Sequence, residues 1–94
     1  MQEKIRAQAI IRGRVQGVFF RMETQRAARR IGVLGWVRNR RDGTVEALFE
    51  GDKHRVDAIL DWCNEGPPHA HVIEVKVDRE EYAGEFESFE INHF

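Results

Sequence analysis

The first half of the chain changes from a strand pattern to a helical one. Residues 5–11 alternate between apolar and polar side chains, which predicts a strand with one buried face. The apolar period then lengthens, and one helical stripe is formed by Phe20, Thr24, Ala27, Ala28 and Ile31. Gly32 follows this stripe and is suited to end the helix, because glycine adopts the left-handed conformation common just past a helix. We therefore predict a strand, a loop over residues 13–20, and a helix.

Two further strands and a second helix are expected downstream. Residues 33–39 and 44–50 are rich in β-branched and apolar residues, and the Asp-Gly pair between them favours a tight hairpin. Gly51 and Asp52 are expected to open a helix, whose apolar face is formed by Val56, Ile59, Leu60 and Cys63. The segment Gly66, Pro67 and Pro68 should end it.

The last quarter of the chain predicts the remaining strands. Residues 72–77 alternate again, and residues 89–94 place Phe89 and Ile91 on one side of a short terminal strand. The order is then strand, helix, strand, strand, helix, strand and a short terminal strand. This is the α+β ferredoxin-like sandwich, βαββαβ, with a mostly antiparallel sheet and two helices on one face. A length of 94 residues predicts one domain, residues 1–94.

Composition indicates an ordinary soluble globule. No apolar run reaches the roughly 18 residues that a membrane span needs, and the N-terminus has no apolar signal-peptide core. Cys63 is the only cysteine, so no internal disulfide is expected and a cytoplasmic location is favoured. Its helical spacing favours a buried thiol over a nucleophile. With no long uncovered apolar patch expected, we predict a monomer that does not bind membranes.

The net charge of -1 hides an asymmetry between the two halves of the chain. Residues 1–47 contain 11 Lys and Arg against 4 Asp and Glu, whereas residues 48–94 contain 4 against 12. Such a distribution is typical of a site for an anionic ligand, and also of two solvated surfaces that mingle in the folded protein. Charge alone leaves both interpretations open.

The segment "GRVQGVFFR", residues 13–21, lies between the first strand and the first helix. The helix after it lacks a Ser, Thr, Asp or Asn that would accept hydrogen bonds from its first amides. An anion at this helix start would accept from those N–H groups, with Gly17 permitting a curled backbone and Arg21 adding a planar set of donors. The same residues also fit an ordinary turn followed by a solvated arginine.

Asn39 ends the second strand, and the expected topology makes it a candidate site residue. The first and second strands run parallel with one strand between them, so their carboxyl ends meet at one edge about 10 Å apart. Arg21 and Asn39 can therefore reach a common point above that edge. Taken alone, Asn39 reads as a turn residue before the hairpin.

These segments together resemble the acylphosphatase family over essentially the whole chain. The resemblance is carried by "GRVQGVFFR", "IGVLGWVRN" and "DGTVEALFEG", and it extends through "WCNEGPPHAHV" to "FEIN". It implies a hydrolase that converts acyl phosphates to a carboxylate and inorganic phosphate, these two being its small-molecule partners. Arg40, Arg41 and the tail "NHF" depart from what many relatives carry, which affects substrate preference more than the reaction class.

The resemblance also implies a role for each site residue. It assigns phosphate binding to the loop residues Val15, Gln16, Gly17, Val18, Phe19, Phe20 and Arg21. Arg21 is implied to hold the phosphate and Asn39 to position the attacking water. Nothing in the sequence calls for a metal or cofactor: His69, His71 and His93 lack a partnered ligand signature, so zinc is not expected. Trp36 and Trp62 are expected to pack rather than to recognise a ligand.

A non-catalytic module is the main alternative. Ferredoxin-like domains can bind RNA or an anionic metabolite, and the basic first half of the chain suits either ligand. The third strand, however, lacks the stacking aromatic residues that RNA-binding modules of this fold use, so no nucleic-acid partner is expected. The presence of both Arg21 and Asn39 argues against a binding role without turnover.

Overall fold

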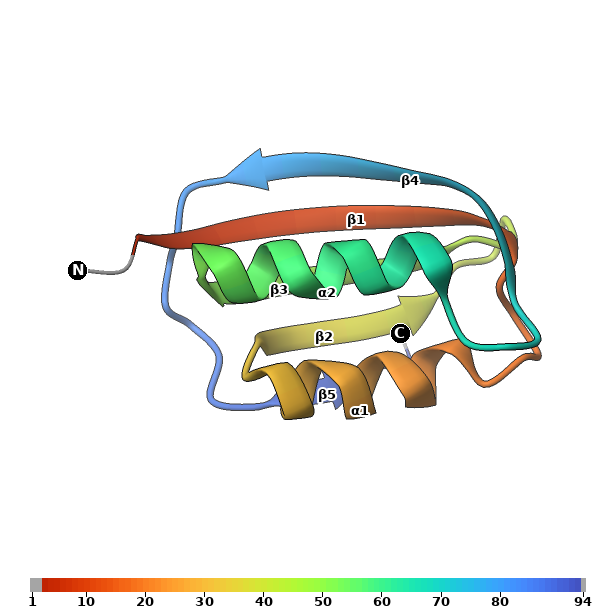
Figure 1. The fold of residues 1–94 in the computed structure, drawn as a ribbon, viewed down its shortest axis with the longest axis horizontal. Coiled ribbons are helices and arrows are strands. Elements are labelled where there is room, and N and C mark those ends of the chain that lie inside the picture. Colours follow the sequence, from red (N-terminus) through yellow and green to blue (C-terminus); the bar gives the residue numbers. More distant parts are fainter. Residues whose placement is uncertain (1–2, 94) are drawn as a thin grey trace.

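The computed structural model describes residues 3–93 and forms two layers, a five-stranded sheet and a pair of helices on one of its faces (Figure 1). The elements are β1 (Lys4–Arg14), α1 (Phe20–Ile31), β2 (Leu34–Asn39), β3 (Val45–Asp52), α2 (Lys53–Glu65), β4 (His71–Glu80) and β5 (Phe89–Ile91). This order confirms the ferredoxin-like βαββαβ prediction and its added terminal strand. In the described residues no helix is both long and apolar enough to cross a membrane.

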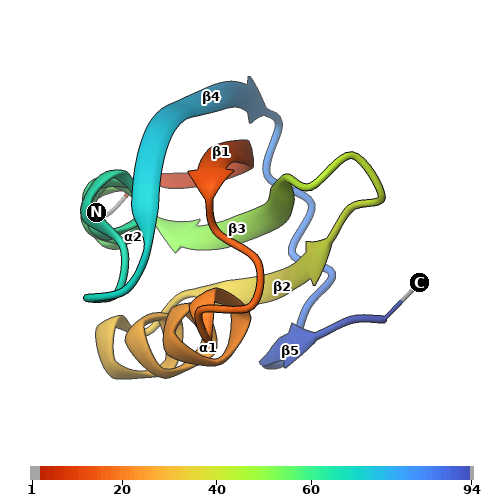
Figure 2. The same ribbon diagram turned by 90° about the vertical axis from the view of Figure 1, so that its right-hand side faces the viewer.

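The sheet order is β4-β1-β3-β2-β5, with every pair antiparallel except β2 and β5. Since β3 lies antiparallel between β1 and β2, those two strands run parallel to each other. Their carboxyl ends therefore meet at one edge of the sheet, where the chain crosses from β1 to α1 (Figure 2). This edge is the one that the sequence predicts to hold the site.

The core lies between the sheet and the two helices. The inward-facing residues of β1 are small, with Ala7 and Ala9 fully buried, which leaves room for aromatic side chains from neighbouring elements. The rings of Phe49 and Phe89 stack with centroids 5.6 Å apart, so the terminal strand β5 is held by packing as well as by pairing. These contacts confirm that Phe89 faces the core.

Helix α2 presents the apolar face that its spacing predicts. Cys63 is completely buried on that face, and burial raises the pKa of its thiol to about 12, so the thiol stays protonated and inert. Trp62 packs its ring against Phe20 with centroids 5.6 Å apart, which confirms a packing role. The helix ends at Gly66, whose N–H donates to the carbonyl of Trp62.

Several element boundaries differ from the sequence prediction, among them those of β4, which runs over His71–Glu80 and not over residues 72–77 alone. Gly13 belongs to β1 rather than to the loop, and it sits at a register shift where a side chain would meet the His71 carbonyl at 2.1 Å. Gly51 and Asp52 are the last residues of β3, and Asp52 is at the same time the N-cap of α2. The hairpin loop has three residues between paired Arg40 and Thr44, with Gly43 left-handed at its end.

The face of the sheet opposite the helices is covered by ion pairs. Arg38 lies 2.6 Å from Glu46, and Arg6 lies 3.3 Å from Glu50, in each case across neighbouring strands. Trp36 lies beside Arg38, whose guanidinium sits 5.7 Å from its ring centroid. An aromatic platform of the kind that RNA-binding sheets display is thus replaced here by paired charges.

A buried carboxylate anchors the connection between β4 and β5 at the end of the strands opposite the predicted site. Glu50 is only 1% exposed and accepts hydrogen bonds from the backbone N–H groups of Ala83, Gly84 and Glu85 at 2.9 to 3.3 Å. Arg6 pairs with it from β1. Although burial favours the neutral acid, these donors hold the pKa of Glu50 below its usual value of 4.5. We call these residues the Glu50 cluster.

Candidate active site

A pocket of about 350 Å³ opens where β1, α1, β2 and the C-terminal segment meet. It is lined by Val15, Gly17, Phe19, Phe20, Arg21, Met22, Asn39, Ile91 and His93. The loop that supplies most of this lining runs from the end of β1 into α1 and continues without a break into the helix (Figure 2). We call this cavity the loop pocket, and residues 15–21 the 15–21 loop.

The backbone amides of the 15–21 loop are left without acceptors. Within residues 3–93, the N–H groups of residues 16–22 donate no hydrogen bond, and the first helical bond runs from the Glu23 N–H to the Phe19 carbonyl at 3.0 Å. No side chain caps α1. Unpaired amides at the positive end of a helix dipole form a ready site for an anion.

Two left-handed residues give the loop its curled shape. Gly17 has φ of 74°, and a side chain at this position would meet nothing within 4 Å, so backbone conformation alone calls for glycine. Phe19 has φ of 63° and is the N-cap of α1. It is the only non-glycine residue with positive φ in the described part of the chain. Such backbone strain is common where a loop must aim its amides at a ligand.

Gln16 fixes the loop against the hairpin that follows Asn39. Its side-chain Nε2 donates to the carbonyls of Arg40 at 2.8 Å and Thr44 at 2.9 Å. The loop and the end of β2 are thereby joined across 24 residues of sequence by one amide. Rigid placement of this kind keeps two parts of a site in register.

Arg21 lies in the first turn of α1 with its guanidinium available to a ligand. It forms no ion pair with a carboxylate among residues 3–93, whereas Arg26, five residues on, pairs with Glu23. Its Nη1 lies 3.5 Å from Nδ1 of His93. Since an arginine at the start of a helix opposes the helix dipole, its position favours a bound anion as its partner.

Asn39 lines the same pocket and carries an unpaired acceptor. Its Oδ1 is buried and accepts no hydrogen bond from any described residue. A buried amide oxygen without a donor is unfavourable, by about 1–3 kcal/mol, so its retention suits a role in binding a donor such as water. The neighbouring loop pocket supplies the space for that donor.

The structure brings most of the residues singled out by the sequence into one pocket. Val15, Gly17, Phe19, Phe20, Arg21 and Asn39 line it. Gln16 and Val18 do not: Gln16 turns its side chain to the hairpin, and Val18 is buried and lines a neighbouring cavity.

Two lining residues from the C-terminal segment escaped the sequence analysis. Ile91 and His93 reach the loop pocket because β5 pairs in parallel with β2 beside Asn39. The apolar Phe89 and Ile91 pattern predicted the strand, but no local signal tells which strand it joins.

Histidine side chains are distributed over separate parts of this end of the molecule. His93 lines the loop pocket and His69 an adjacent cavity. Among residues 3–93, no group of three or more His, Cys, Asp or Glu side chains is arranged to hold a metal ion.

Comparisons with known proteins identify the family and the fold. The acylphosphatase family model matches residues 7–91. An acylphosphatase of Pelotomaculum thermopropionicum is 50% identical over 88 residues, covering 94% of this chain and 96% of the relative. An acylphosphatase of Pyrobaculum islandicum is 54% identical and covers 95% of both chains. The crystal structure of acylphosphatase from Bacillus subtilis superimposes with a TM-score of 0.90 at 33% identity, covering 94% of this chain and 98% of that one.

Proposed function

Because the chain belongs to the acylphosphatase family and hydrolyses acyl phosphates, we propose that the loop pocket is where it does so. In this proposal the amides of the 15–21 loop and the guanidinium of Arg21 hold the phosphoryl group, and Asn39 positions the attacking water. The observation that carries it is the convergence of unpaired amides, an arginine without a carboxylate partner and a buried unpaired amide oxygen on one cavity. Membership of an enzyme family argues against the alternative that the domain binds RNA or an anionic metabolite without turnover.

The phosphate end of the substrate suits the donors of the 15–21 loop. An acyl phosphate carries up to two negative charges on three oxygens, and the loop offers successive N–H groups in addition to the fork of Arg21. Charge on these oxygens is redistributed as the bond to phosphorus breaks. Donors already in place stabilise that change without reorganising, which is the largest contribution to many enzymatic rates.

Asn39 orients the attacking water and does not act as a general acid or base. Its Oδ1 accepts a hydrogen bond from water and directs the water oxygen at phosphorus. The new phosphorus–oxygen bond forms as the bond from phosphorus to the acyl oxygen breaks, and the carboxylate leaves with the electron pair. A phosphate oxygen takes the proton of the water. Because a carboxylate is a weakly basic leaving group, no general acid is required.

Chain organisation and location complete the proposal. We place residues 1–94 in one cytoplasmic domain that acts as a monomer. The only cysteine is the buried Cys63, which is compatible with a reducing compartment.

The test is phosphate release from an acyl phosphate by wild type and by Arg21→Ala and Asn39→Ala variants. Removing the guanidinium of Arg21 should cost about 3 kcal/mol or more of transition-state stabilisation, roughly a 100-fold fall in kcat/KM. Asn39→Ala should lower kcat with little change in competitive inhibition by inorganic phosphate. Arg30→Ala is the matched control, because Arg30 lies on the same helix, exposed and away from the pocket. Wild-type rates in the Arg21 and Asn39 variants would refute these roles.

A further inference from the structure

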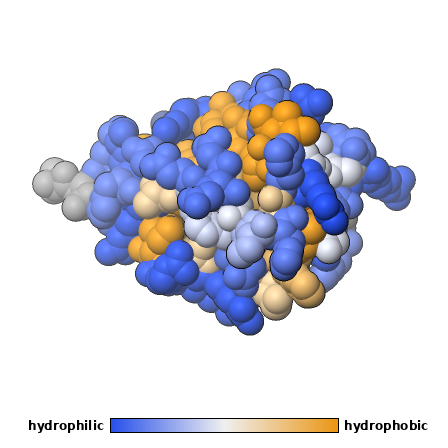
Figure 3. Space-filling model, turned by 45° about the vertical axis from the view of Figure 1, so that its right-hand side comes forward, coloured by the Kyte–Doolittle hydropathy of each residue, from blue (hydrophilic) through white to orange (hydrophobic). Residues whose placement is uncertain are grey.

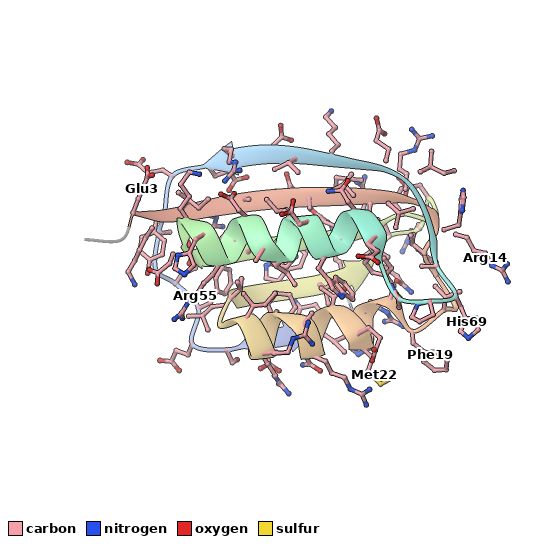
Figure 4. All side chains as sticks on the ribbon, in the orientation of Figure 1. Glu3, Arg14, Phe19, Met22, Arg55 and His69 are labelled. Carbon is pink, nitrogen blue, oxygen red and sulfur yellow. The ribbon has the colours of Figure 1, made fainter. Side chains whose placement is uncertain are left out.

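A second cavity adjoins the loop pocket at the start of α1. It has a volume of about 210 Å³ and is lined by Val18, Phe19, Met22, Glu23, Pro67, Pro68 and His69. Phe19 and Met22 line both cavities, so the two lie side by side. Figure 4 shows Phe19, Met22 and His69 at the same corner of the molecule. We call this cavity the side pocket.

A third cavity lies beyond Asn39 and has the opposite chemistry. It is lined by Arg38, Asn39, Arg40, Arg41 and Asp42, and it shares only Asn39 with the loop pocket. We call it the arginine cleft. The side pocket and the arginine cleft have no lining residue in common. In Figure 2 the segment between α2 and β4 and the end of β2 lie on opposite sides of the 15–21 loop.

The geometry of the proposed reaction distinguishes the two outer cavities. Water attacks phosphorus roughly in line with the departing carboxylate, so nucleophile and leaving group lie on opposite sides of the phosphorus atom. If Asn39 holds the water, the acyl group points away from Asn39 and from the arginine cleft. We propose, resting on the function assigned above, that the side pocket binds the acyl group of the substrate.

Phe19 carries the strongest structural signal for this role. Its backbone is left-handed, a conformation that glycine or asparagine adopts with less strain. Its side chain is 68% exposed, so burial in the core does not account for the phenyl ring. The ring stands between the loop pocket and the side pocket, where a bound acyl group would cover it.

The lining of the side pocket defines the class of acyl group. Val18, Phe19, Met22 and the two prolines present apolar atoms, and Glu23 is already paired with Arg26 at 2.9 Å. In the view of Figure 3, which brings this end of the molecule forward, several patches of apolar surface interrupt the hydrophilic exterior. The volume is below the roughly 300–1,000 Å³ of pockets for drug-sized ligands. The preferred substrates are therefore acyl phosphates with a small aromatic or short aliphatic acyl group.

The test compares benzoyl phosphate with acetyl phosphate. We expect Phe19→Ala and Met22→Ala each to lower the ratio of their kcat/KM values, benzoyl over acetyl, about tenfold relative to wild type. Ile73→Ala is the matched control, because Ile73 is 69% exposed, like Phe19, but lies on β4. Arg41→Gln tests the arginine cleft. Neither of these two variants should change the ratio.

Each outcome bears on one proposal only. An unchanged ratio in both Phe19→Ala and Met22→Ala overturns the side pocket as the acyl site. A lowered ratio in Arg41→Gln instead would place the acyl group in the arginine cleft and also overturn it. A changed inhibition constant for inorganic phosphate identifies any variant whose 15–21 loop has been disturbed. If Phe19→Ala is such a variant, the result for Met22→Ala decides, because Met22 lies outside the 15–21 loop. Arg21→Ala should lower kcat/KM for both substrates by the same factor. Unchanged kcat/KM values in Arg21→Ala would count against the proposed function and not against this inference.

Discussion

The two ends of the sheet use the same chemistry for different purposes. At one end, the amides of Ala83, Gly84 and Glu85 converge on the carboxylate of Glu50, with Arg6 alongside. At the other end, the 15–21 loop lines a cavity with Arg21 alongside, and its amides have no acceptor among residues 3–93. The first set of donors has an anion from its own chain, and the second set has none among the described residues.

The comparison shows how a small protein separates stability from function. An internal carboxylate anchors the long connection from β4 to β5 through hydrogen bonds that need no ligand. The open set of amides has to be held in place by other means, which here are Gln16, the left-handed residues and the packing of α1. Unsatisfied donors lower stability, so they persist where a ligand supplies their acceptor.

The largest effect is expected from removing the internal anion. Glu50→Ala leaves Arg6 and three amides without their acceptor, which should lower the free energy of unfolding by about 3–5 kcal/mol. Denaturant unfolding measures this loss. Below the unfolding transition, kcat/KM should stay near the wild-type value because the cluster lies at the far edge of the sheet. A large fall in kcat/KM of the folded variant would show that the two ends are coupled.

A smaller effect should separate the 15–21 loop from the neighbouring β2–β3 hairpin through glycine substitutions. Gly17 and Gly43 both have positive φ, and a side chain at either position would meet nothing within 4 Å. Gly17→Ala and Gly43→Ala should each cost about 1 kcal/mol of stability through backbone strain. Only Gly17→Ala should weaken inhibition by inorganic phosphate, about tenfold, since Gly17 lies in the 15–21 loop and Gly43 lies in the hairpin. Equal inhibition constants in the two variants would contradict a phosphate-binding loop.

The smallest effect concerns pH. The pKa of Glu50 is lower in the folded protein than in the unfolded chain, so its carboxylate stabilises the fold above the unfolded pKa, and this stabilisation is lost as pH falls through the folded pKa. The stability difference between wild type and Glu50→Gln should therefore narrow below about pH 4.5. Asp42 and Asp57 also have lowered pKa values, but both variants keep them. A difference that stays constant with pH would contradict this account of Glu50.

Sequence patterns could predict the fold because each element carries its own local signal. The alternation of β1, the stripe of α1 and Gly32 as its terminator are all present in the structure. Parallel placement of β1 and β2 then follows from topology, and with it the approach of Arg21 to Asn39. The hypothesis of an anion site rested on the missing helix cap, and α1 has no side-chain cap.

Features that depend on distant partners could not be predicted in the same way. Glu50 lies near the end of β3, and its burial has no sign in the local sequence, because its amide donors lie more than thirty residues away. His93 approaches Arg21 only because β5 joins β2. The left-handed backbone of Phe19 is hidden as well, since phenylalanine is not a residue from which that conformation is expected.

The most direct test of phosphate binding by the 15–21 loop is an NMR titration with inorganic phosphate that follows each backbone amide. We predict that the amide signals of Gly17, Val18, Phe19, Phe20 and Arg21 shift together, with one dissociation constant equal to the inhibition constant of phosphate. The signals of Ala83, Gly84 and Glu85 should stay in place, because Glu50 already occupies their donors. Saturation of the protein by phosphate with no shift in the 15–21 loop would contradict the account.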